Sequence, residues 1–280
     1  LKRAKLWGEI VVVTTLLVLH NCIISVPKRK VHLSTSNIIT NCIRISELRA
    51  QRGNYHVLAG SSMTGRLPAN SASDEAGMPV INLGLDGCGP IEALDFLTNA
   101  EQAPDVVLLE LNALSSVAPE NARAVVEATQ GAGYHLRGRV PFLRFEERPV
   151  DLLYSWLHSR GKEEASTSIT GIQIPAPAVY KTQSALLSDE LVELAVQKIR
   201  KLQSRGTRVV LVMLPDNGKE HPREYAAAAA IGAQLGLPLM DLKPSLETKL
   251  KYTDSVHLDA GSGAQLAAAL GRWLREAPPR

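Results

Sequence analysis

Five short apolar runs recur along the chain and set the first expectation about its fold. Each is rich in Val, Leu and Ile, and none alternates with polar residues as a half-solvated strand does. Such runs predict strands that are buried on both faces, as in a parallel sheet. The runs are HVLAG (56–60), PVINLG (79–84), DVVLLELN (105–112), RVVLVML (208–214) and LPLMDL (237–242).

Segments with helical periodicity lie between these runs. The clearest spans 188–206, where apolar residues recur at three- and four-residue steps. Acidic residues open this segment and basic residues close it, which suits the helix dipole. Two further helices are predicted at 221–236 and 261–277. Alternating strands and helices imply right-handed crossovers and a three-layer α/β domain.

The N-terminal region follows a different pattern. Residues 6–26 are mostly apolar and long enough for one membrane-spanning helix, with three basic residues on each side. The alternative is an amphipathic helix packed on the domain. The balanced basic residues do not decide the orientation of a span. We therefore expect a membrane anchor at 1–30, a polar connector with short helices at 31–53, and an α/β domain at 54–280.

One stretch interrupts the rhythm of strands and helices. Residues 113–185 show little strand pattern and contain several Gly and Pro residues. They predict an insertion between two core elements, part helix and part loop. The insertion is either a lid or substrate wall, or a variable excursion on the surface.

Composition narrows the classes of function. A chain of 280 residues with 45% hydrophobic and 21% charged residues can bury a full core. The net charge of +3 and the 4% aromatic content argue against nucleic acid as a partner. The cysteines form no C-x-x-C pair and no H-E-x-x-H occurs, so we expect no metal site. The absence of a Gly-rich phosphate fingerprint also disfavours a nucleotide binder.

Two serines follow the first apolar run, where a catalytic hydroxyl would be well placed. In open α/β sheets, ligands bind beyond the carboxyl ends of the strands. A serine that opens the next helix has its hydroxyl near the positive end of the dipole, beside free backbone N–H groups. The other reading is a helix N-cap. Ser61 and Ser62 are both candidates, and G-x-S-x-G, the signature of the nucleophile elbow, is absent around Ser62.

Three further segments would supply the rest of a site. GLDGCG follows the second run, and the backbone N–H of Gly87 would donate to an oxyanion. Asn112 ends the third run, so its amide is a candidate for a second donor. In YTDSVHLDA, Asp254 lies three residues before His257, so one loop presents both. A base acting on serine needs such a carboxylate to fix its tautomer.

Taken together, the blocks GSSMT, GLDGCG and DSVH resemble those of the SGNH (GDSL-like) hydrolase family. The resemblance covers roughly 54–112 and 207–275 and implies a flavodoxin-like three-layer fold. It assigns Ser62 as nucleophile, Asp254 and His257 as its partners, and Gly87 and Asn112 as oxyanion donors. Two departures stand out: Ser61 replaces the usual Asp, and LELNALS lacks the usual Gly-x-Asn-Asp of the third block.

The resemblance also implies a function. We expect a serine-dependent esterase or O-acyltransferase, tethered to the bacterial inner membrane with its domain on the periplasmic side. Its substrate would be an acyl ester, such as an acetyl group on an envelope polysaccharide, and neither a cofactor nor a metal would be needed. The competing interpretation is a catalytically degenerate SGNH-like domain that binds glycan or a partner protein.

Overall fold

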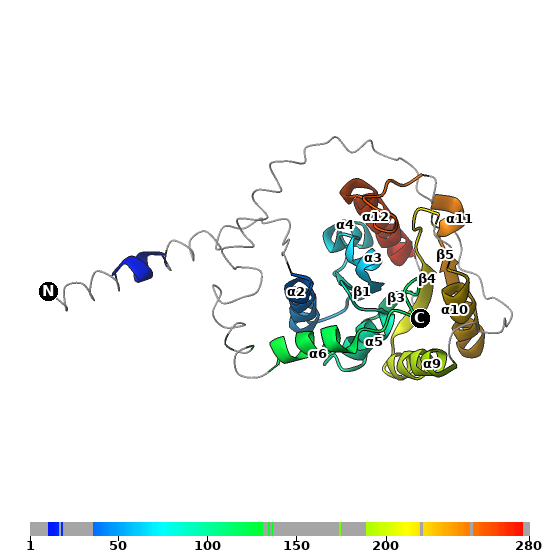
Figure 1. Cartoon of the computed structure of the whole chain (residues 1–280), viewed down its shortest axis with the longest axis horizontal. Helices are drawn as coiled ribbons and strands as arrows, with labels where there is room; N and C mark the ends of the chain where they lie inside the picture. The colour runs from blue at the N-terminus through cyan, green and yellow to red at the C-terminus, as the bar shows by residue number, and fades with distance from the viewer. Residues whose placement is uncertain are drawn as a thin grey trace. The chain divides into compact units, whose positions relative to one another are not determined.

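The computed structural model describes residues 11–16, 18, 36–130, 134, 136, 174, 189–218, 221–246 and 249–276. The chain divides into two compact units. One unit combines Arg44–Arg123 with Ala165–Arg280, and the other combines Leu1–Ile43 with Ala124–Glu164. The first unit contains every strand that the structure describes and all of the candidate site, so the account that follows concerns this unit (Figure 1).

A single parallel sheet forms the centre of this unit. Its order is β2-β1-β3-β4-β5, and every neighbouring pair is parallel. The five predicted strands and the parallel α/β fold are therefore confirmed. The strands are β1 (His56–Ser61), β2 (Val80–Leu85), β3 (Val106–Glu110), β4 (Arg208–Met213) and β5 (Leu239–Asp241).

Helices connect the strands in the predicted alternation. The three helices predicted from periodicity correspond to α9, α10 and α12. The connector contains one helix of 14 residues, α2, where the sequence suggested short helices. The helices are α2 (Asn37–Ala50), α3 (Ser62–Gly65), α4 (Ala69–Ala76), α5 (Pro90–Thr98), α6 (Pro119–Ala128), α9 (Asp189–Ser204), α10 (Pro222–Leu235), α11 (Lys243–Leu246) and α12 (Ala260–Glu276).

The sheet is covered by helices on both faces. Alternate strand residues such as Leu58, Leu108 and Val210 pack beneath α4 and α12, which lie against each other (Figure 1). α5, α9 and α10 cover the other face. Because both faces are buried, the strands needed continuous apolar runs, which is why they were visible in the sequence.

The strand register brings the ends of β1, β2 and β3, where the candidate site residues lie, to one edge of the sheet. Gly60 pairs with Gly84 and Ser61 with Leu85, so β1 and β2 end side by side. β3 pairs with β1 in the same direction, and its last residue is Glu110. The loops that follow these three strands therefore start from the same carboxyl edge, which is where open α/β sheets bind ligands.

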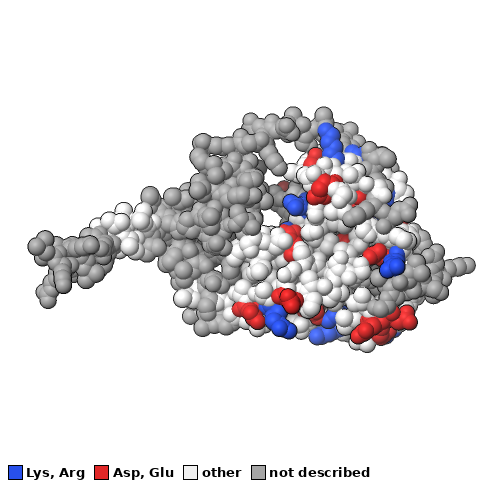
Figure 2. Space-filling view, viewed as in Figure 1, with Lys and Arg blue, Asp and Glu red and all other residues white. Residues whose placement is uncertain are grey.

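The described surface carries charges of both signs. Figure 2 shows acidic and basic side chains interspersed over the described part of this face. This mixture agrees with the small net charge of +3.

Most of the predicted anchor lies outside the described residues. Its residues 11–16 and 18 are helical and exposed. Within the described ranges, no helix combines the length and the apolar character that a membrane crossing requires. The predicted insertion is described from 113 to 130, where it contains α6, and at three later positions. The remainder of the insertion lies outside the described residues.

Candidate active site

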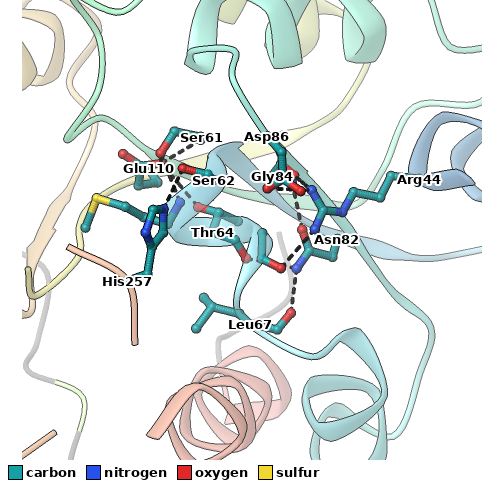
Figure 3. Close-up of polar contacts among 12 residues, drawn as sticks. Arg44, Ser61, Ser62, Thr64, Leu67, Asn82, Gly84, Asp86, Glu110 and His257 are labelled. Atoms are coloured by element: carbon teal, nitrogen blue, oxygen red, sulfur yellow. Dashed lines mark hydrogen bonds and ion pairs between the residues drawn. The ribbon is translucent and has the colours of Figure 1, made fainter. Parts of the chain in front are cut away.

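Three side chains predicted from the sequence lie in one continuous series of contacts. Ser62 opens α3 directly after β1, and its Oγ lies 2.9 Å from Nε2 of His257 (Figure 3). Nδ1 of His257 lies 2.8 Å from Oδ2 of Asp254. Ser62 and His257 are 195 residues apart in sequence, so only the fold brings them together. Hydroxyl, imidazole and carboxylate are thus arranged in the order that serine nucleophiles use.

A tight turn holds the carboxylate against the imidazole. Oδ1 of Asp254 accepts the backbone N–H groups of Val256 and His257, each at 2.8 Å. The N–H of Thr253 donates to the carbonyl of His257 at 2.8 Å and closes the turn. These backbone N–H groups, together with the His257 side chain, lower the pKa of the Asp254 carboxyl below its ordinary value. The Asp254 carboxylate is therefore ionised at neutral pH.

The two adjacent serines have different environments. Ser61 is 3% exposed, and its hydroxyl donates to Oε2 of Glu110 at 2.7 Å. Oγ of Ser61 also accepts the N–H of Met63 at 3.2 Å and so caps α3. Ser62 is partly exposed and faces the imidazole. The geometry therefore selects Ser62 over Ser61 as the hydroxyl that the base can reach.

Glu110 is a member of the site that the sequence analysis missed. It is 2% exposed and accepts the N–H of Ser61 at 2.7 Å and the N–H of Ala113 at 3.2 Å. Burial raises the pKa of its carboxyl, and the hydrogen bonds from Ser61 and Ala113 oppose that shift. A lone Glu inside an apolar run was the signal, because a buried carboxyl requires partners.

Gly60 makes room for this carboxyl. Its φ is +153°, and a Cβ at this position would lie 2.5 Å from Oε2 of Glu110. The same Cβ would lie 2.8 Å from Oγ1 of Thr64. Only glycine combines this backbone conformation with so close an approach.

The predicted oxyanion glycine lies at the same edge of the sheet as Ser62. Gly87 is exposed in the loop after β2 and has a φ of +70°. Asn121 donates to its carbonyl at 2.7 Å and so fixes the loop. The oxyanion role of its backbone N–H stays a prediction.

Asn112 has a different environment from the one expected of an oxyanion donor. It is 1% exposed, and its Nδ2 donates to the carbonyl of Leu214 at 2.8 Å. Its Oδ1 accepts the N–H of Leu214 at 2.7 Å. The side chain thus joins the end of β3 to the end of β4. This engagement leaves the predicted oxyanion role of Asn112 without support.

A second charged cluster, also missed from the sequence, follows β4. Asp216 is fully buried, and its carboxylate lies 2.8 Å from Nζ of Lys243 and 2.5 Å from Nε2 of His221. The next residue, Asn217, has a φ of +56° and donates to the carbonyl of Asp254 at 3.5 Å. The segment that follows β4 therefore contacts the loop that carries Asp254 and His257.

Among the described residues, no group of three His, Cys, Asp or Glu side chains is arranged to hold a metal ion. Cys42 is buried, and Cys88 is a buried free thiol. In comparisons with known proteins, the chain matches no protein-family model and no curated protein.

Proposed function

We propose that this chain is a serine-dependent acyl-ester hydrolase or O-acyltransferase of the SGNH type, with Ser62 as nucleophile. The observation that carries the proposal is the 2.9 Å contact between Oγ of Ser62 and Nε2 of His257, with Asp254 behind the ring. A serine hydroxyl is a weak nucleophile at neutral pH, and an adjacent base that accepts its proton activates it.

In the first half of the reaction, an acyl-enzyme forms. Nε2 of His257 takes the proton from Ser62 as Oγ bonds to the ester carbonyl carbon. The carbonyl π electrons move to oxygen and give a tetrahedral oxyanion. When the oxyanion collapses, the carbon–oxygen bond to the alcohol breaks, and His257 returns its proton to the departing alkoxide.

In the second half, water or a sugar hydroxyl takes the place of the alcohol. It loses a proton to His257 and attacks the acyl carbon, and Ser62 leaves with the proton that the imidazole holds. Water yields hydrolysis, and a sugar hydroxyl yields transfer. The N–H groups of Ser62 and Gly87 are the proposed oxyanion donors. The first of them belongs to a helix N-terminus, where N–H groups have no intrahelical partner.

The fold supports this assignment. The strand order β2-β1-β3-β4-β5 is that of flavodoxin-like sheets, which the SGNH resemblance implies. In such sheets the order in which strands are added reverses between β1 and β3, and ligands bind at this switch point. Ser62 follows β1 and Glu110 ends β3, so the candidate nucleophile lies at that point.

The proposed setting is the bacterial envelope. The apolar segment 6–26 with basic flanks is the proposed tether, and an envelope polysaccharide carrying acyl esters is the proposed substrate class. A protease added to spheroplasts should digest the α/β domain if it faces the periplasm, and an intact domain would contradict this location.

Labelling with a fluorophosphonate probe tests the chemistry. The wild type should be labelled and should hydrolyse p-nitrophenyl acetate, and Ser62→Ala should abolish both activities. Ser204→Ala serves as the control, because this serine lies at the exposed end of α9 and bonds only to the carbonyl of Lys201. Absence of labelling in the wild type, or labelling that survives Ser62→Ala, would refute the proposal.

One observation favours the second candidate, a degenerate domain that binds glycan or a partner protein. The Asn112 amide is engaged with Leu214, so the site lacks the side-chain donor of the third family block. Removing one oxyanion donor costs about a hundredfold or more in rate. This candidate would be favoured if a glycan slows the folded chain in affinity electrophoresis and the probe does not label it.

A further inference from the structure

Arg44 connects helix α2 to the two segments that carry the candidate nucleophile and the candidate oxyanion donor. Its guanidinium donates through Nη1 to the carbonyl of Gly84 and through Nη2 to that of Gly65 at 3.0 Å. Nη1 also lies 3.4 Å from Oδ1 of Asp86. The Arg44 side chain is only 14% exposed, so these contacts are largely shielded from water (Figure 3).

Two glycines allow the backbones of α3 and β2 to touch beneath this guanidinium. A Cβ on Gly84 would lie 2.2 Å from the backbone nitrogen of Gly65 and 2.7 Å from the carbonyl oxygen of Ser61. A Cβ on Gly65 would lie 2.9 Å from Nη1 of Arg44. No side chain fits at either position, so the nucleophile helix and the second strand are in direct contact.

Asn82 reinforces the same junction from β2. Its Nδ2 donates to the carbonyls of Thr64 and Leu67, at 2.9 and 2.5 Å, and its Oδ1 accepts the N–H of Gly84 at 2.7 Å. At the end of α3, the carbonyl of Gly65 thus accepts from Arg44, and that of Thr64 accepts from Asn82 as well as from the N–H of Leu67. A one-turn helix has little stability of its own, so these side chains determine where α3 lies.

We propose that Arg44 is a positioning residue that fixes the Ser62 helix relative to the loop bearing Gly87. This inference rests on the proposed function. Helix α3 carries Ser62, and Gly87 comes directly after Asp86. One guanidinium therefore contacts both segments that carry the proposed oxyanion donors. The planar fork of arginine is required, because two carbonyls and a carboxylate are bound in different directions. Arg44, in helix α2, is therefore part of the proposed active unit.

The expected effect of Arg44→Ala is on turnover and not on substrate affinity. Misplacing catalytic groups by about 1 Å costs on the order of a hundredfold in rate. We expect kcat to fall about 10- to 100-fold while KM stays within about threefold, the pattern of a lost transition-state interaction. Arg44→Lys keeps the charge but not the fork and should fall in between.

The experiment uses the full chain with p-nitrophenyl acetate and a rescue step. Millimolar guanidinium ion, far below denaturing levels, should restore activity to Arg44→Ala in a saturable manner, and methylammonium should not. Arg52→Ala is the matched control, since Arg52 is 67% exposed and reaches no part of the site. Hydrogen exchange of the amides from Gly84 to Cys88 should accelerate in Arg44→Ala only.

Each outcome supports or overturns the inference. Unchanged kcat in Arg44→Ala, or a loss of kcat without guanidinium rescue and with matching loss of global stability, would overturn it. If the wild type shows no esterase activity, the proposed function fails separately. Exchange at Gly84–Cys88 then decides the positioning role: faster exchange in Arg44→Ala supports it, and unchanged exchange refutes it.

Discussion

Gly60→Ala tests whether the buried Glu110 carboxyl determines the conformation of the nucleophile turn. Gly60 is the last residue of β1 before the two serines, and it has a φ of +153°. An added Cβ would meet Oε2 of Glu110 at 2.5 Å, Cβ of Glu110 at 2.7 Å and Oγ1 of Thr64 at 2.8 Å. The side chains of Glu110 and Thr64 are both buried and hydrogen-bonded. Neither can move away from an added Cβ without breaking those bonds.

The magnitude has two parts. Holding alanine in a sparsely populated backbone region costs about 1–3 kcal/mol. Crowding in a packed interior costs about another 1–3 kcal/mol. The free energy of unfolding should therefore fall by about 2–6 kcal/mol, a large share of the roughly 5–15 kcal/mol that stabilises a typical domain.

Gly77→Ala isolates the backbone part. Gly77 caps α4 with a φ of +72°, and a Cβ there would meet nothing within 4 Å. We expect urea unfolding, followed by circular dichroism, to show a larger loss for Gly60→Ala than for Gly77→Ala, by about 1–3 kcal/mol. Equal losses in the two variants would show that Glu110 does not crowd this turn, and the packing account of the nucleophile segment would be wrong.

Four other expectations follow from the structure. The pKa of Asp254 is lowered, so the stability advantage of the wild type over Asp254→Asn should be present above about pH 4 and shrink below it, as urea unfolding at several pH values will show. The pKa of Glu110 is raised, which has the opposite effect on stability: the wild type should lose stability relative to Glu110→Gln as pH rises from about 4. Asn112→Ala leaves both backbone groups of Leu214 without their side-chain partner and should cost about 2–4 kcal/mol in thermal or urea unfolding, whereas a hundredfold loss of kcat at full stability would restore the oxyanion role. Burial raises the pKa of the Cys88 thiol to about 11, so iodoacetamide at pH 8 should modify the Cys88 peptide only after denaturation, and rapid native modification would contradict its buried position.

The strands were predictable because this sheet is buried on both faces. A strand such as Val106–Glu110 needs apolar side chains on both sides, which gives a continuous run in the sequence. The shortest strand, β5, begins two residues later than predicted. The reason is local: the N–H of Leu237 bonds back to Gly232 and closes α10, and Pro238 has no N–H to offer to a neighbouring strand.

The candidate site was predictable in part. Asp254 and His257 are close in sequence, so their contact needs only one turn. The contact of His257 with Ser62 followed from topology, because strand ends meet at one edge of a parallel sheet. Arg44 carried no motif, and Glu110 carried only the signal of a lone acidic residue inside an apolar run. Their partners are largely backbone carbonyls and N–H groups, which leave no pattern in a sequence.

The central strand β3 shows how these missed residues change the chemistry that the site can support. Glu110 and Asn112 are two residues apart at its end and form bonds in different directions. Glu110 binds Ser61 beside the candidate nucleophile, and Asn112 binds Leu214 after β4. Both polar side chains are thus used to join β3 to its neighbours. The proposed oxyanion donors are therefore backbone N–H groups alone, and their placement depends on the backbone of α3 and of the loop after β2. This dependence explains why a site with few functional side chains has so many residues, from Arg44 to Glu110, that hold its backbone in position.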